Sequence, residues 1–340
     1  MAVMVTGGAG YIGSHAVKRL LEAGHAVLAI DNLERGHREA IDALERISAG
    51  RLGFAETDIG DRERVAGLMR EHAVDTVMHF AALAYVGESV EQPLRYYRAN
   101  TSGALGLLEA CDEVGVSRFV FSSTCATYGE PPAVPMPETT PQNPMSPYGV
   151  SKLHVEHMLK DYAHAQRTAG KPFSYAALRY FNVAGSDPDG LVGEDHEPET
   201  HLIPVVIQAA LGVRDAISIF GTDYDTPDGT CIRDYVHVCD LVDAHLAVLE
   251  ALSPGDERFY NLGIGKGYSV REIIDAVRRV SGRGFEVREV ERRPGDPAAL
   301  FADASKIRSE LGWSAKYTDI DEIVRTAWDW LSTHPGGYRS

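Results

Sequence analysis

Short apolar runs alternate with longer amphipathic stretches over the first half of the chain. Residues 2–6, 26–30, 76–81, 118–122 and 175–180 are rich in β-branched and apolar side chains and predict buried strands. Between them, residues 14–23, 62–72 and 100–114 repeat apolar side chains at helical spacing. Such alternation is typical of a parallel sheet covered by helices on both faces, so we expect a doubly wound α/β fold.

After residue 182 the pattern changes to loops rich in glycine, proline and aspartate, at 185–199 and 221–230. Helices are predicted near 202–211 and 270–280. A regular α/β half followed by a loop-rich half predicts two domains, 1–181 and 182–340, with the second smaller. The later segment 234–249 is a candidate to return to the first domain.

The composition of the chain argues against nucleic acid, metal ions and membranes as binding partners. The formal net charge of -16 argues against a nucleic-acid surface, which needs basic side chains to neutralise phosphates. The four cysteines form neither a C-x-x-C pair nor zinc spacing, so we expect reduced thiols and no metal site. No apolar run approaches the roughly 18 residues of a membrane span, and no leader sequence is apparent. These observations favour a cytoplasmic protein without a membrane partner.

A glycine-rich turn follows the first predicted strand. Gly7 permits a tight turn, Gly10 lets backbone approach a pyrophosphate, and Gly13 lets the following helix pack closely on the strand. The first N–H groups of that helix would face the anion. The second strand ends at Asp31, whose carboxylate would accept hydrogen bonds from ribose hydroxyls. The first domain is therefore predicted to bind a dinucleotide.

The choice between NAD and NADP depends on the charges near the second strand. The carboxylate of Asp31 would repel a ribose phosphate and so favours NAD. Arg35 and Arg38 lie close by in sequence and are the argument for NADP. We expect NAD.

A second signal is the segment Ser146-Pro147-Tyr148-Gly149-Val150-Ser151-Lys152. Ser146 suits a helix N-cap and Pro147 the first helical position, so a helix should begin here. Tyr148 and Lys152 are four residues apart and would share one helix face. A tyrosine with a pKa of about 10 becomes a base near neutral pH only if nearby positive charge stabilises the phenolate by roughly 4 kcal/mol. Lys152 and an oxidised nicotinamide could supply that stabilisation.

A hydroxyl that hydrogen-bonds the reacting oxygen would complete the catalytic group. Ser122, Ser123 and Thr124 follow the fourth predicted strand at the sheet edge where such folds bind ligands. Capping of the strand end is an adequate explanation for the two serines, and Thr124 is the candidate.

These residues belong to longer motifs that resemble the extended short-chain dehydrogenase/reductase family and, within it, the UDP-glucose 4-epimerase family. The motifs are TGGAGYIGSH, DNL from Asp31, SSTCATYGE, SPYGVSKL, LRYFNVAG, GTCIRDYVHV, YNLGIGKGYSV and RRPGD. They run through nearly the whole chain. RYFN and RDYVH are far more specific than the glycine turn.

The resemblance implies a set of NAD contacts. Tyr11 and Ile12 would lie on the pyrophosphate, residues 31–36 around the ribose, and residues 80–84 along the nicotinamide half. The implied contacts beyond the glycines are Tyr11, Ile12, Asp31, Asn32, Leu33, Arg35, Gly36, Asp58, Ile59, Phe80, Ala81, Ala82, Leu83, Ala84, Asn100 and Phe181, with Tyr148 and Lys152.

The resemblance also implies the nucleotide-sugar contacts, which are Thr124, Tyr148, Asn182, His201, Leu202, Ile219, Phe220, Arg233, Arg293, Asp296 and Leu300. The forked donors of Arg233 and Arg293 suit a diphosphate on physical grounds as well. Three positions depart from the family pattern. Thr124 replaces a serine, His201 stands where some members have asparagine, and Ala84 lacks a basic side chain found in relatives.

The implied reaction is removal of a hydride from carbon 4 of UDP-glucose or UDP-galactose to NAD and its return to the opposite face of the 4-keto sugar. Alternatives are epimerisation of a UDP-N-acetylhexosamine, UDP-pentose or UDP-uronic acid, and a non-catalytic dinucleotide sensor. A dehydratase is disfavoured because Cys125 and Ala126 replace its acid pair. Leu300 would favour hexoses over their N-acetyl forms.

The resemblance further implies a homodimer through the helices after Asn100 and Tyr148. Leu105, Leu108, Leu153 and Met158 would suit the interface, although the same side chains could pack inward.

Overall fold

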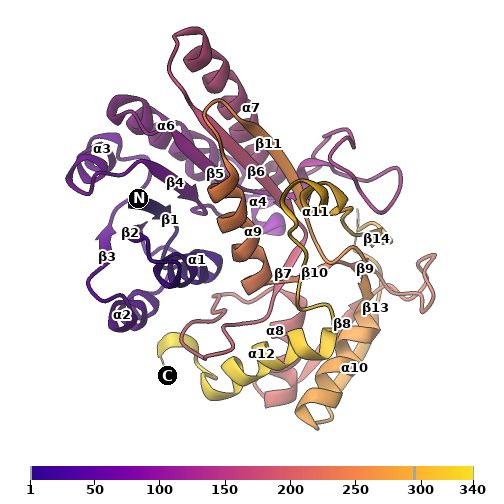
Figure 1. The fold of residues 1–340 in the computed structure, drawn as a ribbon. Helices are drawn as coiled ribbons and strands as arrows, with labels where there is room; N and C mark the ends of the chain where they lie inside the picture. The colour runs from indigo at the N-terminus through magenta and orange to yellow at the C-terminus, as the bar shows by residue number, and fades with distance from the viewer. Residues whose placement is uncertain (1, 294–295, 340) are drawn as a thin grey trace. The chain divides into compact units, whose positions relative to one another are not determined.

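The computed structural model describes residues 2–293 and 296–339 (Figure 1). The chain folds into two compact units, each described separately. The N-terminal unit comprises Met1–Glu130, Thr139–Arg179 and Val242–Tyr260, and the C-terminal unit comprises Pro131–Glu138, Tyr180–Leu241 and Asn261–Ser340. No helix in the described ranges is both long and apolar enough to cross a bilayer.

A seven-stranded sheet forms the centre of the N-terminal unit, in the order β11-β6-β5-β4-β1-β2-β3. β1 pairs in parallel with β2 on one side and β4 on the other, β2 with β3, and β4 with β5. The strands are β1 (Ala2–Thr6), β2 (Ala26–Asp31), β3 (Leu52–Glu56), β4 (Thr76–His79), β5 (Arg118–Thr124), β6 (Ser174–Tyr180) and β11 (Glu257–Leu262). The chain order reverses beside β1, which is the switch point where doubly wound folds bind ligands. The predicted fold class is confirmed.

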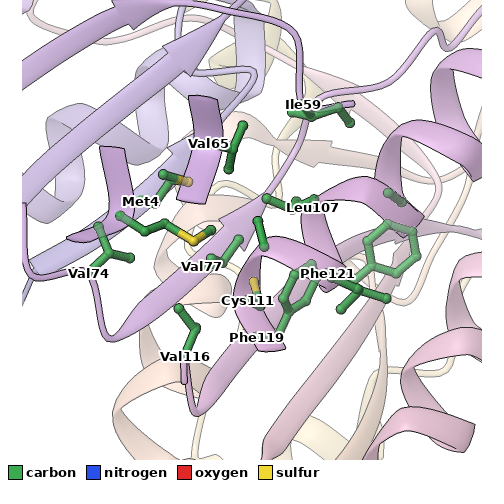
Figure 2. Close-up of a cluster of buried hydrophobic side chains, with 14 of the residues drawn as sticks. Met4, Ile59, Val65, Val74, Val77, Leu107, Cys111, Val116, Phe119 and Phe121 are labelled. Carbon is green, nitrogen blue, oxygen red and sulfur yellow. The ribbon is translucent and has the colours of Figure 1, made fainter. Parts of the chain in front are cut away.

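Helices cover this sheet because its central strands are apolar on both faces; Val3, Met4 and Val5 are fully buried. The helices of the unit are α1 (Tyr11–Glu22), α2 (Arg38–Ile47), α3 (Arg62–Glu71), α4 (Val86–Glu91), α5 (Pro93–Tyr96), α6 (Gly103–Val114) and α7 (Pro147–Thr168), with a π-helix η1 (Tyr97–Ser102) and a 3-10 turn η2 (Cys125–Thr127). Figure 2 shows Leu107 and Cys111 of α6 beside Val77 and Phe119 of the sheet. Each such buried side chain contributes roughly 1.5–3 kcal/mol.

The C-terminal unit has short strands and its own core. Its strand pairs are β7 (Asn182–Ala184) with β10 (Tyr235–His237), β8 (Ala216–Phe220) with β13 (Glu286–Val290), and β9 (Ile232–Arg233) with both β12 (Tyr268–Ser269) and β14 (Ala299–Leu300). Its helices are α8 (Leu202–Leu211), α10 (Val270–Ser281), α11 (Ser305–Leu311) and α12 (Ile320–Thr333), with the turn η3 (Gly337–Arg339). Apolar side chains of α8, α10 and α12 form the core. The residues of α9 (Val238–Ala251) are divided between the units: those up to Leu241 belong to the C-terminal unit and those from Val242 to the N-terminal unit.

The beginning of α7 matches the sequence prediction closely. Ser146 is its N-cap, and the serine hydroxyl accepts a hydrogen bond from the Gly149 N–H at 3.2 Å. Pro147 occupies the first helical position. Tyr148 and Lys152 consequently lie in the first two turns, where the side chains of one face follow each other along the helix.

Candidate active site

The turn between β1 and α1 needs glycine at two positions. Gly7 has a φ of +70°, and an added Cβ would lie 2.7 Å from the backbone nitrogen of Ala81. At Gly13 an added Cβ would lie 1.9 Å from the carbonyl oxygen of Gly7. At Gly10 the nearest protein atom would be 3.4 Å away. No protein atom therefore requires glycine at position 10. The space beside Gly10 and the N–H groups at the start of α1 suit a phosphate group.

Asp31 ends β2 beside this turn and is 8% exposed. Its two carboxylate oxygens accept hydrogen bonds from the Ala9 N–H at 3.0 Å and the Leu33 N–H at 2.9 Å. Each oxygen keeps a second lone pair for a hydroxyl donor. Gly36 packs against the carboxylate, since a Cβ there would lie 2.9 Å from both oxygens. Burial raises the pKa of Asp31, and its backbone hydrogen bonds oppose this effect.

Both arginines that argued for NADP have acidic partners. Arg35 forms a 3.0 Å ion pair with Glu88, and its guanidinium lies 4.7 Å from the centre of the Tyr85 ring. Arg38 pairs with Asp42 at 2.8 Å and with Glu45 at 2.9 Å. A ribose phosphate would have to compete with these carboxylates, so the geometry favours NAD.

Hydrogen bonds hold the predicted cofactor contacts that follow β2 and β3. The Asn32 side-chain amide donates to Asp58 at 3.0 Å, and Asp58 also accepts from the Gly60 N–H at 2.7 Å. Ile59 is buried and packs close to Gly103 at the start of α6. These contacts fix the loop after β3.

Asn100 braces the predicted nicotinamide segment. Its amide exchanges two hydrogen bonds with the backbone of Leu83, at 2.8 and 2.9 Å, and donates to the Ser151 hydroxyl at 3.0 Å. Asn100 lies in the π-helix η1, a feature frequent at functional sites. Asn100 therefore joins residues 80–84 to α7. The resemblance had not indicated this linking role. Within the same segment, the Ala81 N–H donates to the Thr6 hydroxyl at 3.3 Å.

The first turn of α7 packs closely on the turn that follows β5. An added Cβ at Gly149 would lie 2.4 Å from the carbonyl oxygen of Ala126 in η2. The Tyr148 ring is 7% exposed and packs in an apolar cluster with Leu83 and Tyr96. This packing places Tyr148 beside η2 and the end of β5.

Lys152 is 3% exposed. Its ammonium donates to the carbonyl oxygen of Ser122 at 3.0 Å and lies 5.0 Å from the centre of the Phe121 ring. Burial lowers the pKa of Lys152 to about 7. A negative phenolate or a polar ligand beside the ammonium would favour its charged form again.

Two hydroxyls at the end of β5, those of Ser123 and Thr124, have different partners. Thr124 caps η2 by accepting a hydrogen bond from the Ala126 N–H at 3.1 Å, which leaves its own O–H able to donate. Ser123 donates to Glu156 at 2.6 Å. Glu156 in turn forms a buried ion pair with Arg179 at 2.6 Å. Ser123 therefore belongs to a buried polar network, and of these two hydroxyls that of Thr124 has donor capacity for a ligand.

In the C-terminal unit, five of the predicted substrate residues lie close together. Arg233 pairs with Asp296 at 2.7 Å. The guanidinium of Arg293 lies 3.7 Å from the centre of the Phe220 ring. The Asp296 N–H donates to the Arg293 carbonyl at 3.3 Å, and Leu300 is the partner of Arg233 in the β14–β9 register. The structure thus assembles two guanidinium groups, an aromatic ring and Leu300. Pro294 and Gly295 of the RRPGD motif lie outside the described residues.

Other predicted substrate residues have different surroundings. The Ile219 side chain is 1% exposed and belongs to the core, so a ligand could reach only its backbone. His201 is the N-cap of α8, and its Nδ1 lies 2.9 Å from Glu199. Leu202 packs against the same core, and the Asn182 N–H donates to the Asp234 carbonyl. Phe181, another predicted cofactor contact, is 8% exposed and lies in the C-terminal unit.

Asp234, next to Arg233, is a buried carboxylate to which the sequence analysis assigned no role. Its carboxylate accepts hydrogen bonds from the N–H groups of Ile264 at 2.9 Å, Ala302 at 3.1 Å and Gly265 at 3.3 Å. Burial raises the pKa of Asp234 to about 6. It fixes the strand that carries Arg233. The sequence feature that could have drawn attention to Asp234 is its position in the RDYVH motif.

Comparisons with known proteins agree with this geometry. Residues 3–263 match the NAD-dependent epimerase/dehydratase family. The chain is 46% identical to UDP-glucose 4-epimerase from Lacticaseibacillus casei, over 99% of each sequence. It is also 46% identical to a probable UDP-arabinose 4-epimerase from Oryza sativa subsp. japonica, over 99% of this chain and 84% of the relative.

A solved structure supports the same assignment. UDP-glucose 4-epimerase from Stenotrophomonas maltophila, with bound NAD and formylated UDP-arabinopyranose, superposes with a TM-score of 0.94 at 42% identity and 99% coverage of both chains. Both the fold and the sequence therefore agree over almost the full length. The chain belongs to the NAD-dependent epimerase/dehydratase family.

Proposed function

We propose that the protein is an NAD-dependent isomerase that interconverts UDP-galactose and UDP-glucose. The observation that carries this proposal is the packing of Tyr148 and Lys152, on one face of α7, against the end of β5 in a unit with a dinucleotide-type glycine turn. Full-length relatives at 46–48% identity bear the name UDP-glucose 4-epimerase.

Tyr148 is the proton acceptor for the sugar hydroxyl in this proposal. Lys152 stabilises the phenolate through its charge, because the two groups follow each other on one helix face. The Thr124 hydroxyl donates to the reacting oxygen, while its acceptor side stays engaged with Ala126. When bound, NAD would supply the hydride acceptor and donor for carbon 4 of the sugar. The glycine turn and Asp31 would hold this cofactor.

The C-terminal unit supplies the groups for the nucleotide diphosphate. Arg233 and Arg293 carry the forked donors that suit phosphate oxygens. Asp296 holds Arg233 in place through the ion pair, and Phe220 supports Arg293. Leu300, beside Arg233 on the neighbouring strand, is positioned to limit the size of the sugar.

A second candidate substrate is UDP-arabinose, because relatives at 45–46% sequence identity are named UDP-arabinose 4-epimerase or probable UDP-arabinose 4-epimerase. The same catalytic residues would serve a pentose. The test is a panel of UDP-galactose, UDP-arabinose and UDP-N-acetylglucosamine, each incubated with the protein without added cofactor. We expect the largest kcat/KM for UDP-galactose. Turnover of UDP-arabinose alone would contradict the hexose assignment.

We also propose that the protein forms a homodimer. Val90 of α4, Leu94 of α5 and Leu105 of α6 are 63%, 78% and 47% exposed. By contrast, Leu108 of the predicted interface is 5% exposed and belongs to the core. Light scattering should give twice the chain mass, and Leu94→Glu should reduce it. A monomeric wild type would contradict the proposal.

A further inference from the structure

Four side chains with metal-ligand chemistry meet where the loop after β7 enters α8. They are Glu194, His196, Glu199 and His201, and one ligand atom of each lies within 4.8 Å of the others. Within residues 2–293 and 296–339 this is the one such group of three or more histidine, cysteine, aspartate or glutamate side chains. None of the catalytic steps proposed above uses this cluster.

The distances in this cluster are those of ligand atoms around a common centre. Nδ1 of His201 lies 2.9 Å from Glu199 Oε1 and 3.2 Å from Glu194 Oε1. Nδ1 of His196 lies 3.2 Å from Glu194 Oε1 and 3.6 Å from Glu199 Oε2. With ligands about 2.0–2.1 Å from a tetrahedral zinc ion, neighbouring ligand atoms are about 3.3–3.4 Å apart. The four separations lie on either side of that value.

We propose that this cluster binds one divalent transition-metal ion, with zinc as the preferred ion, through both imidazole Nδ1 atoms and one oxygen of each carboxylate. Two nitrogen donors disfavour magnesium and calcium, which prefer oxygen ligands alone. Two carboxylates neutralise the charge of the ion while both imidazoles stay neutral.

Glu194 provides an independent observation. It is 3% exposed, and its Oε1 lies 3.2 Å from Nδ1 of both His196 and His201 but outside hydrogen-bonding geometry among the residues that the structure describes. A buried carboxylate oxygen without a well-aligned donor is costly, and a metal ion would satisfy it.

The alternative is a cluster of ion pairs with two protonated histidines. In that arrangement, against the effect of their burial, Glu194 and Glu199 would raise the pKa of both imidazoles. The His196 and His201 ring centres are only 5.0 Å apart, so the two imidazolium charges would repel each other. Metal coordination has no such repulsion because neutral imidazole is the ligand form.

The backbone around the cluster is already fixed in position. Trp330 Nε1 donates to the carbonyl oxygen of Glu194 at 3.1 Å, and the Tyr338 N–H donates to the Asp195 carboxylate at 2.9 Å. Glu199 Oε1 accepts from the N–H groups of Thr200 and His201, at 2.7 and 2.8 Å. Such supporting hydrogen bonds orient metal ligands in known sites. The ion would tie this loop to the beginning of α8.

The test starts with the wild-type protein, produced without an affinity tag in zinc-supplemented medium. Elemental analysis should find one zinc ion per chain, and X-ray absorption should show nitrogen and oxygen ligands at about 2.0–2.1 Å. Replacement of zinc by Co²⁺ should give the visible absorption of a tetrahedral site. A metal-free wild type that also fails to bind added zinc chloride would overturn the proposal, as would sulfur ligands or oxygen ligands alone.

Two variants localise the ion. Glu194→Gln and His196→Asn should each weaken zinc affinity by at least about 100-fold, since ligands contribute more than the supporting residues that cost 10–100-fold. The control is His157→Asn, an exposed histidine on α7, which should keep the full zinc content. Equal loss in the control would overturn the assignment. If a variant misfolds, the wild-type spectra still decide the question.

Discussion

At the scale of single residues, the proposed chemistry depends on two side chains of α7. Tyr148 and Lys152 were predicted from their spacing together with the glycine turn, on a helix whose start at Ser146-Pro147 is a local signal in the sequence. The acceptor of the Lys152 ammonium, the Ser122 carbonyl, could not be predicted, since it depends on how α7 packs on β5. The same limit applies to Ile219, whose burial depends on the core of its unit.

Tyr148→Phe should retain NAD but lose about 10²–10⁴-fold in kcat, because the ring packing survives and the proton acceptor does not. The control is Tyr162→Phe on the same helix, whose hydroxyl donates to the exposed Asp112. Steady-state assays on UDP-galactose should show near-normal turnover for the control. Near-normal turnover in Tyr148→Phe would refute its role as base.

Lys152→Met tests the burial of the ammonium in the dinucleotide-free protein. The pKa of Lys152 is lowered from 10.5 to about 7, so between these values the unfolded chain binds more protons and stability rises with pH. Below about pH 7 Lys152 is protonated in both the folded and the unfolded chain, so the free-energy cost of burying the ammonium no longer changes with pH. The stability gain of Lys152→Met over wild type should therefore be largest near pH 6 and shrink as the pH approaches 10.

Denaturant unfolding at several pH values measures this difference. The control is Lys160→Met, at an exposed position on the same helix. Its free energy of unfolding should change with pH in parallel with that of the wild type. Parallel profiles for Lys152→Met as well would show that the buried ammonium does not titrate in this range.

Leu300→Ala should raise kcat/KM for UDP-N-acetylglucosamine more than for UDP-glucose. An acetamido group is several atoms larger than a hydroxyl, and packed walls yield poorly to added volume. The measurement is the ratio of the two kcat/KM values in wild type and variant. Equal wild-type turnover of both sugars would contradict a steric role for Leu300.

At the scale of elements, the turn between β1 and α1 depends on helix–loop contact. Gly13→Ala places a Cβ 1.9 Å from the Gly7 oxygen, so the helix must shift and the cofactor cradle with it. We expect lower thermal stability and loss of co-purified dinucleotide. The matched control is Gly67→Ala in α3, where an added Cβ meets nothing within 4 Å. That change should be neutral or stabilising by about 0.5–1 kcal/mol.

Thermal melts and enzymatic assay of released dinucleotide measure both effects. If Gly13→Ala kept its cofactor and its melting temperature, close packing at this turn would be irrelevant to binding.

Elements with strong periodicity were predicted, and weaker ones were missed. β1 and α8 have the predicted bounds because their apolar patterns are continuous. β3 was not predicted; it is an edge strand whose residues are only partly buried or exposed, so its apolar pattern is weak. The π-helix η1 has no sequence signature, and it determines where Asn100 points.

At the scale of the whole molecule, the two compact units contain different parts of the proposed chemistry. The glycine turn, Tyr148 and Lys152 lie in the N-terminal unit, and Arg233 and Arg293 lie in the C-terminal unit. The cluster of Glu194, proposed here to bind zinc, was not expected from the sequence. The absence of a metal site was inferred from the spacing of the cysteines, whereas this cluster consists of histidine and glutamate side chains.

The most direct test of the central claim uses UDP-galactose labelled with deuterium at carbon 4 and protein purified without added cofactor. The account predicts UDP-glucose that retains the deuterium at carbon 4, because the hydride moves to bound NAD and back without meeting solvent. Mass spectrometry and NMR of the product measure the label. Loss of the deuterium to water, or no UDP-glucose at all, would contradict the account.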